Sequence, residues 1–395
     1  MANRKLLETQ SDRIEMVLSS HKAPARVTGG VVTPRAVQFR LAPALGTKVS
    51  KVQSLADELA LALGASNVRV SRQGNTMQIE VPRDDAQPVR LLPLMVRLVA
   101  DPRKGMGQPA ASLKRSAAHQ ERREAQTSFS LPPFTAVLGM CDDGAPLLMR
   151  LASPDVAHVL ISGTTGSGKT ALCQTMILSL AMTHRRSQLQ FVLIDPKRRA
   201  FAPFASLPHL LWPLIDNAPD AVGAMGELGK LMEARDYAAG AGQTAPTPCI
   251  VVVLDELADL MQAAGKPLGA HLTRLAQRGR EAGIHVIACT QKPSSQVLGT
   301  LIRANFPARL VGKVVSPEDA RVAAGIGGTG AERLAGRGDF LAVAAGQVLR
   351  FKGAYVSPAE MGQVVAQMGS APRRWDVQGR PSLLRQAVAL VARTG

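Results

Sequence analysis

The run that most constrains this chain is Gly-Thr-Thr-Gly-Ser-Gly-Lys-Thr at residues 163–170. The apolar segment HVLIS stands directly before it, and the segment ALCQTMILSL follows it. A glycine-rich turn between a strand and a helix points backbone N–H groups at a phosphate, and the helix N-terminus adds a positive dipole end. A chance glycine-rich turn is the alternative. Both flanking segments are of the type that a nucleotide-binding phosphate loop requires.

This loop predicts ATP and Mg²⁺ as cofactors. The ammonium of Lys169 is expected to reach the β- and γ-phosphate oxygens, and the hydroxyl of Thr170 is expected to ligate Mg²⁺. The predicted nucleotide contacts are Gly163, Thr164, Thr165, Gly166, Ser167, Gly168, Lys169, Thr170 and Ala171.

Two acids follow the apolar run Ile250-Val-Val-Val-Leu254. A strand that ends in carboxylates places them at the carboxyl edge of a parallel sheet, where phosphates bind. We expect Asp255 to complete the Mg²⁺ shell and Glu256 to orient or deprotonate the attacking water. The alternative is that both residues only cap the helix that follows.

Further candidates lie at the end of the segment IHVIACTQ and on the helix before it. Gln291 is placed to sense the γ-phosphate, and the alternative is a polar strand end that faces solvent. Arg274, Arg278 and Arg280 read most simply as a solvated basic face. A ring ATPase needs one arginine from a neighbouring subunit at the γ-phosphate, and the residues alone do not choose among the three.

The chain divides by pattern into segments. Residues 131–360 alternate short apolar strands with amphipathic helices, which predicts an α/β domain whose parallel central sheet is covered on both faces. A small α+β domain is predicted ahead of it at residues 26–100, where Gln-Gly-Asn at 73–75 signals a hairpin. We predict an N-terminal helix at 1–25, a basic linker or arm at 101–130 and a helical tail at 361–395.

Composition limits the kinds of partner and the cellular location that the chain can have. The formal net charge is +17, which favours a polyanionic partner, and only 3% of the residues are aromatic, which disfavours a single-strand binder that stacks bases. No apolar run has the length of a membrane helix, the N-terminus lacks a secretory signal, and the cysteines show no metal-ligand spacing. The expectation is a cytoplasmic protein without an integral membrane segment.

Together these segments resemble the FtsK/SpoIIIE/HerA superfamily of DNA-pumping ATPases. The resemblance is carried by HVLISGTTGSGKTALCQTMILSL, FVLIDPKRRAF, IVVVLDELADLM, LTRLAQRGREAGIHVIACTQKPS and LIRANFPARL, and upstream by GGVVTPRAVQFRL with QIEVP. It implies a RecA-like motor that forms a homo-oligomeric, hexameric ring around double-stranded DNA.

The resemblance also assigns residues. Arg280, in the Gly-Arg-x-x-Gly step, matches the trans-acting arginine of related coupling ATPases. The loop after IDPK resembles a pore loop that touches the DNA backbone, and the loop beyond Gln291 is a second candidate; mere exposure explains the same residues. The residues on nucleotide-site positions are Lys169, Thr170, Asp255, Glu256 and Gln291, and the DNA-contact candidates are Lys197, Arg198, Arg199 and Lys292.

Compared with this family, we expect no N-terminal membrane segment and no complete winged-helix module, and Pro34 interrupts an expected strand. The function predicted is ATP-dependent translocation of double-stranded DNA. A protein-secretion ATPase and a DNA-packaging or conjugation ATPase are the alternatives within the superfamily. A nucleotide-binding scaffold without activity is a further alternative, disfavoured by the intact Lys169, Asp255 and Glu256.

Overall fold

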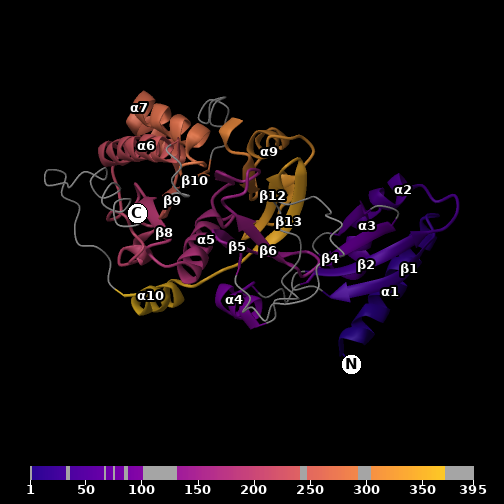
Figure 1. Ribbon diagram of the computed structural model, residues 1–395. Coiled ribbons are helices and arrows are strands. Elements are labelled where there is room, and N and C mark those ends of the chain that lie inside the picture. Colours follow the sequence, from indigo (N-terminus) through magenta and orange to yellow (C-terminus); the bar gives the residue numbers. More distant parts are fainter. Residues whose placement is uncertain are drawn as a thin grey trace. The chain divides into compact units, whose positions relative to one another are not determined.

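The computed structural model describes residues 2–32, 36–65, 68–73, 76–83, 88–100, 131–240, 247–291 and 304–369. The chain forms two compact units, Met1–Val89 with Asp142–Gly144, and Arg90–Cys141 with Ala145–Gly395 (Figure 1). The domain boundaries drawn from the sequence stay predictions. The predicted arm at 101–130 lies outside the described residues, as does the tail beyond residue 369.

The first unit is an antiparallel sheet of order β1-β2-β4-β3 covered by helices. Ile14 and Leu18 of the first helix are fully buried against the sheet, together with Phe39 and Ile79. The Gln-Gly-Asn hairpin is confirmed, since Gln73 pairs with Thr76. The elements are α1 (Ala2–Ser20), β1 (Ala25–Val32), β2 (Ala36–Pro43), α2 (Val49–Ser54), α3 (Ala56–Leu63), β3 (Arg69–Gln73) and β4 (Thr76–Pro82).

The interruption expected around Pro34 takes the form of two strands. Strand β1 lies at the edge of the sheet, and its register against β2 shifts between Val27 and Gly29, which marks a bulge. Edge strands and bulges are where a sheet tolerates a missing N–H donor. Pro34 itself is outside the described residues.

The second unit is built on a nine-stranded sheet of order β6-β5-β13-β12-β11-β7-β10-β9-β8. Strands β11, β7, β10, β9 and β8 run parallel, and β12, β13, β5 and β6 extend the sheet in antiparallel fashion. The strands are β5 (Thr135–Cys141), β6 (Pro146–Arg150), β7 (Val159–Ser162), β8 (Leu189–Ile194), β9 (Cys249–Leu254), β10 (Ile284–Thr290), β11 (Ala308–Val311), β12 (Asp339–Ala344) and β13 (Gln347–Gly353).

Helices cover this sheet on both faces (Figure 1). One face carries α6 and α7, which bury alternate strand residues such as Leu160, Val252 and Val286. Helix α5 packs on β5, β7 and β10. Because the central strands are covered twice, every residue of β9 and β10 is buried. The helices are α4 (Leu91–Ala100), α5 (Lys169–Thr183), η1 (Ala202–Phe204), α6 (Ala218–Gly240), α7 (Leu257–Arg278), α9 (Pro317–Ala324), η2 (Ala331–Arg333) and α10 (Pro358–Gln367).

The predicted α/β architecture is confirmed: a parallel central sheet, preceded along the chain by a small α+β unit. The antiparallel extension has no local signal in the sequence, because β13 pairs with β5 from a distant part of the chain. Strand β13 has exposed and half-buried residues at most positions. Over the described ranges, none of the helices is long and apolar enough to cross a membrane.

Candidate nucleotide-binding site

The glycine-rich run forms a loop between the end of β7 and the start of α5. Gly163, Gly166 and Gly168 have φ values of 151°, 80° and 100°, a backbone region that favours glycine. A Cβ on Gly163 would lie 2.8 Å from the hydroxyl of Ser167, and a Cβ on Gly168 would lie 2.9 Å from the backbone nitrogen of Gly338. The curvature of the loop and its close packing therefore both depend on glycine.

Lys169 folds back over this loop. Its ammonium donates hydrogen bonds to the carbonyl oxygens of Gly163 at 2.6 Å and Thr164 at 3.1 Å. Burial lowers the pKa of Lys169, and the carboxylates of Glu256 and Asp255 act in the opposite direction. Thr170 follows on the first turn of α5 and is half-buried. The ammonium thus lies across the concave side of the loop, as a phosphate ligand would require.

Two segments brace the loop from one side. One of them directly follows β11, and the other directly precedes β12. The carbonyl oxygen of Lys313 accepts a hydrogen bond from the backbone of Thr164 at 2.7 Å. The backbone nitrogen of Arg337 donates to Gly166 at 2.9 Å, and that of Gly338 donates to Ser167 at 2.7 Å. Sequence reasoning assigned no role to either segment, although Gly-Arg-Gly-Asp at 336–339 was a visible signal of a special turn.

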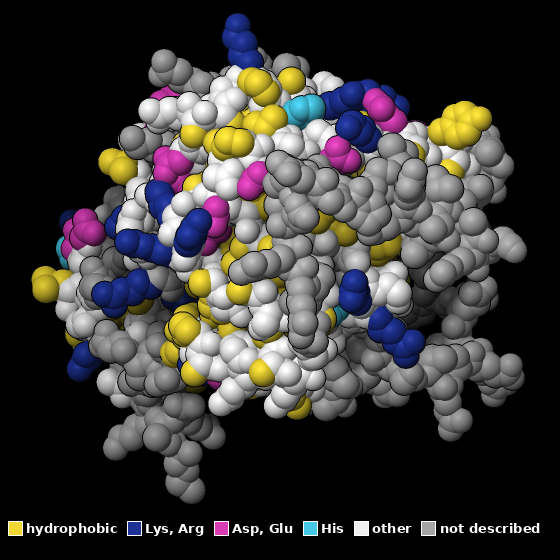
Figure 2. All heavy atoms as spheres, turned by 90° about the vertical axis from the view of Figure 1, so that its left-hand side faces the viewer, with side chains coloured by type: hydrophobic (Ala, Val, Ile, Leu, Met, Phe, Trp, Pro, Cys, Tyr) yellow, Lys and Arg dark blue, Asp and Glu magenta, His cyan; other side chains and the backbone are white. Residues whose placement is uncertain are grey.

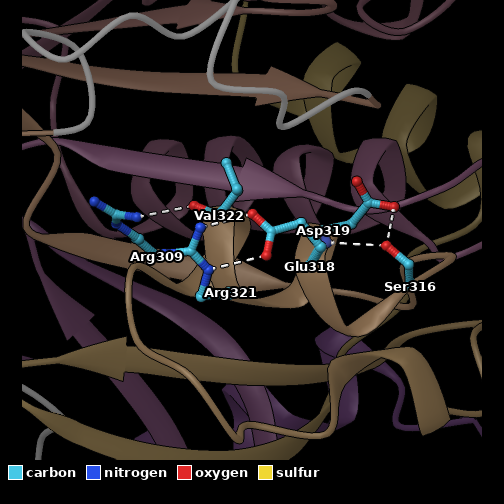
Figure 3. Close-up of polar contacts among 6 residues, drawn as sticks. All are labelled: Arg309, Ser316, Glu318, Asp319, Arg321 and Val322. Carbon is cyan, nitrogen blue, oxygen red and sulfur yellow. Dashed lines mark hydrogen bonds and ion pairs between the residues drawn. The ribbon is translucent and has the colours of Figure 1, made fainter.

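Helix α9 stands between these two segments in the chain and packs on β11 and β12. Ser316 caps it by accepting a hydrogen bond from the backbone of Asp319 at 3.1 Å, and Arg309 of β11 donates to the carbonyl of Val322 at 3.2 Å (Figure 3). The ion pair of Arg321 with Glu318 lies on the exposed side at 2.7 Å. The helix therefore holds in place the part of the chain that lies between the two bracing segments.

The predicted acids follow β9, two strands away from the phosphate loop. Burial raises the pKa of Asp255 to about 6, with Asp195 and Glu256 adding to the effect. Asp195 directly follows the neighbouring strand β8 and is buried, and its carboxylate accepts backbone hydrogen bonds from Lys197 and Phe201. Asp195 is an acidic neighbour to which the sequence analysis gave no role.

Gln291 links the acids to the phosphate loop. Its backbone nitrogen donates to the carboxylate of Glu256 at 3.1 Å, and its side-chain oxygen accepts a hydrogen bond from the hydroxyl of Thr165 at 2.9 Å. Glu256 is buried and holds a φ of 52°, uncommon for a residue with a side chain. The structure thus brings the predicted residues of three neighbouring strands, β7, β10 and β9, to one edge of the sheet.

The surroundings of this edge fit a nucleotide with a divalent cation. The hydroxyl of Ser167 is buried in the loop and has no hydrogen-bond partner among the residues that the structure describes. Asp255 sits among carboxylates, so a cation beside it relieves their repulsion. Among the described residues, His, Cys, Asp and Glu alone form no group sufficient for a metal site. Mg²⁺ held by one or two protein oxygens together with substrate phosphates matches that donor set.

Three of the four predicted DNA contacts, Lys197, Arg198 and Arg199, are described and exposed, and the structure gives two of them acidic partners. Lys197 pairs with Asp259 at 2.7 Å, and Arg198 pairs with Asp216 at 2.6 Å. Arg199 is exposed, and Lys292 lies outside the described residues. On the face shown in Figure 2, Lys and Arg side chains lie at several places and are interspersed with Asp and Glu.

The three arginines of the α7 region differ in their partners. Arg274 pairs with Glu233, and Arg278 pairs with Asp236 at 2.7 Å, so both join α7 to α6. Arg280 lies in the turn beyond α7 and pairs with the adjacent Glu281 at 3.3 Å.

Solved structures with this fold include a secretion ATPase and a conjugation coupling protein. The cytoplasmic domain of the type VII secretion ATPase EccC from Thermomonospora curvata aligns with a TM-score of 0.53 at 24% identity, over 66% of this chain and 33% of that one. The conjugation coupling protein TcpA of pCW3, solved with ATPγS, aligns with a TM-score of 0.57 at 15% identity, over 91% of this chain and all of that one. These similarities establish the fold.

The sequence matches are more specific. The DNA translocase FtsK of Lactiplantibacillus plantarum is 33% identical over 91% of this chain, and the DNA translocase SftA of Bacillus subtilis is 31% identical over 97%. This chain spans 44% and 39% of those proteins, less than half of each. The FtsK/SpoIIIE family pattern matches residues 118–239 and 236–295, and the FtsK alpha domain pattern matches residues 1–83. The chain therefore belongs to the FtsK/SpoIIIE family.

Proposed function

We propose that this protein hydrolyses ATP and uses the energy to move along double-stranded DNA as a hexameric ring. The observation that carries the proposal is the hydrogen-bonded path from Glu256 through Gln291 to Thr165. It connects a carboxylate suited to activating water with the loop suited to holding phosphates. A change at the γ-phosphate would therefore alter the hydrogen bonds of Gln291 and shift the end of β10 with the chain that follows it.

Each residue has a defined part in this proposal. Lys169 would exchange its carbonyl partners on the loop for the β- and γ-phosphate oxygens, and Thr170 and Asp255 would hold Mg²⁺, which would neutralise phosphate charge. Glu256 orients the attacking water and accepts its proton. Gln291 reports the state of the γ-phosphate. The backbone N–H groups of residues 166–171 orient the phosphates at the start of α5.

The arrangement of arginines supports Arg280 as the residue that acts on a neighbouring subunit. Arg274 and Arg278 are held by acids of α6. Arg280 has only its chain neighbour Glu281 as an ion-pair partner within the described residues, and such exposed pairs are weak. Of the three arginines, Arg280 therefore loses the least ion-pair energy when it turns to bind a phosphate.

Duplex DNA is favoured as the substrate by sequence and charge. The relatives named DNA translocases are 31–33% identical over more than nine-tenths of this chain. The secretion ATPase shares the fold at 24% identity. The net charge of +17 suits a polyanion, and phosphate contacts are independent of base sequence, as movement along DNA requires.

The deciding experiment measures steady-state ATP hydrolysis with and without duplex DNA at several salt concentrations. We expect duplex to raise the rate several-fold, with the gain falling as salt rises because DNA binding releases counterions. Glu256→Gln should still bind ATP but hydrolyse it at least about a hundredfold more slowly. Arg280→Ala should bind ATP normally and lose the stimulated rate.

Mixing Arg280→Ala with Glu256→Gln tests the ring. If Arg280 acts across a subunit boundary, some mixed interfaces combine an intact Glu256 with an intact Arg280, so the mixture should be more active than the mean of the two variants. Electron microscopy with duplex and ATPγS should then show closed rings around DNA. Equal hydrolysis rates with and without duplex, in a protein that forms no ring, would refute the proposal.

A further inference from the structure

The bracing side of the phosphate loop carries two basic residues beyond Lys169. Arg337 follows Gly336 in the turn before β12, and Lys313 lies just beyond β11. Both are tied to the loop by their main chains: Arg337 donates to Gly166 at 2.9 Å, and Lys313 accepts from Thr164 at 2.7 Å. Their Cα atoms are therefore fixed next to the loop whatever the side chains do.

The two side chains are exposed. Among the described residues, neither the guanidinium of Arg337 nor the ammonium of Lys313 makes a hydrogen bond or an ion pair. This distinguishes them from Lys352, whose ammonium donates to the carbonyl oxygen of Arg337 at 2.7 Å. A Cβ on Gly336 would come within 4.0 Å of the Lys313 side chain, so the two basic residues border the same turn.

The backbone at Arg337 points to a use for its side chain. Its φ is 49°, between glycines at 75° and 90°. Glycine adopts such a conformation without steric strain, whereas the Cβ atom of an arginine makes it unfavourable. Residues held in this region against their preference cluster at ligand sites. The turn is also rigidly held, because Asp339 at its end receives two hydrogen bonds from Arg350 and one from the backbone of Ala335.

We propose that Arg337 and Lys313 bind the polyphosphate of the nucleotide in the same subunit, from the side of the loop opposite the acids. This inference rests on the proposed function, since it concerns the same nucleotide. Asp195, Asp255 and Glu256 put negative charge on one side of the loop. Arg337 and Lys313 put positive charge on the other, where a polyanion gains charge-assisted contacts that a neutral nucleoside does not.

The test measures binding of ATPγS and of adenosine to the full chain by titration calorimetry with Mg²⁺, together with thermal unfolding. The variants are Arg337→Gly, Arg337→Gln, Lys313→Gln and the double variant Lys313→Gln with Arg337→Gln. Arg333→Gln is the matched control, because Arg333 is an exposed arginine of the same segment that pairs with its neighbour Glu332.

We expect each single variant to weaken ATPγS binding about fivefold to tenfold and the double variant more, with adenosine binding unchanged. Arg337→Gly is the critical variant, because glycine relieves the backbone at that position: its unfolding temperature should not fall while its affinity does. If Arg337 had only a structural role, the unfolding temperature of Arg337→Gly would change while its affinity for ATPγS stayed the same.

Lys169→Ala in the same titrations separates two kinds of failure. If wild type binds ATPγS, Lys169→Ala does not, and the Arg337 and Lys313 variants stay within twofold of wild type, this inference is wrong and the proposed function stands. If wild type itself does not bind ATPγS, the proposed function fails. An equal loss of ATPγS affinity in Arg333→Gln would also overturn the inference, because a general charge effect would then explain it.

Discussion

The histidine at the start of β7 provides a prediction that depends only on burial and linkage. The Nδ1 atom of His158 accepts a hydrogen bond from the backbone of Val286 at 3.0 Å, and its Nε2 atom is buried with no hydrogen-bond partner in the described part of the chain. The ring packs against His285 and Phe306, with centroids 6.3 and 6.0 Å apart. Burial, with a smaller contribution from His285, lowers the pKa of His158 to about 3.

The sign of the effect follows from the two pKa values. A histidine in the unfolded chain titrates near 6.5, so below that pH the unfolded state binds a proton that the folded state refuses. The contribution of neutral His158 is fully present above pH 6.5 and is lost as the pH falls toward 3. At pH 5.0 the difference of 1.5 pH units from 6.5 corresponds to about 2 kcal/mol of unfolding free energy.

The assay compares wild type with His158→Asn, whose side-chain oxygen can still accept the hydrogen bond from Val286 but cannot titrate. Urea unfolding is followed by Trp212 fluorescence in a Trp375→Phe background at pH 7.5 and 5.0. Wild type should lose about 2 kcal/mol more than the variant between the two values. The exposed His21→Asn serves as control and should behave as wild type. Equal losses in wild type and His158→Asn would refute the reasoning.

Two further predictions concern contacts around the same sheet. Asp339→Asn should lower the unfolding free energy of the second unit by about 3 kcal/mol in urea titrations, because the carboxylate is buried and the variant removes the charge that pairs with the guanidinium of Arg350. Ser357→Ala should cost about 1 kcal/mol in the same assay, since it removes the capping box that Ser357 and Glu360 form at the start of α10. A loss below about 1 kcal/mol for Asp339→Asn, or none for Ser357→Ala, would contradict these assignments.

The parts of the fold that the sequence predicted are those with a local cause. The central strands read as continuous apolar runs because both faces are covered, and β9 and β10 are buried at every position. The hairpin at Gln73 and Thr76 followed from turn residues. The antiparallel side of the sheet has no such signal: β13 pairs with β5, more than 200 positions earlier in the chain.

The candidate site divides in the same way. Lys169, Asp255 and Glu256 stood out because their chemistry requires those residue types next to strand ends. The partners of Gln291 did not, since a hydrogen bond to Glu256 and another to Thr165 depend on strand order in the folded sheet. Arg198 looked like a free basic residue in the sequence, and its pairing with Asp216 became visible only in three dimensions.

The bracing segments explain why the phosphate loop needs more of the chain than its own motif. Gly166 and Ser167 each bond to the turn before β12, and Thr164 bonds to Lys313 beyond β11. The rigidity of the loop is therefore set by residues more than 140 positions later in the chain. Hydrogen-bond donors that are already held in place lose little conformational entropy when a ligand binds. A loop held in this way therefore binds phosphate more tightly than the same motif on an unrestrained turn. Changes in the turn before β12 should consequently alter nucleotide affinity even where no side chain of the motif is touched.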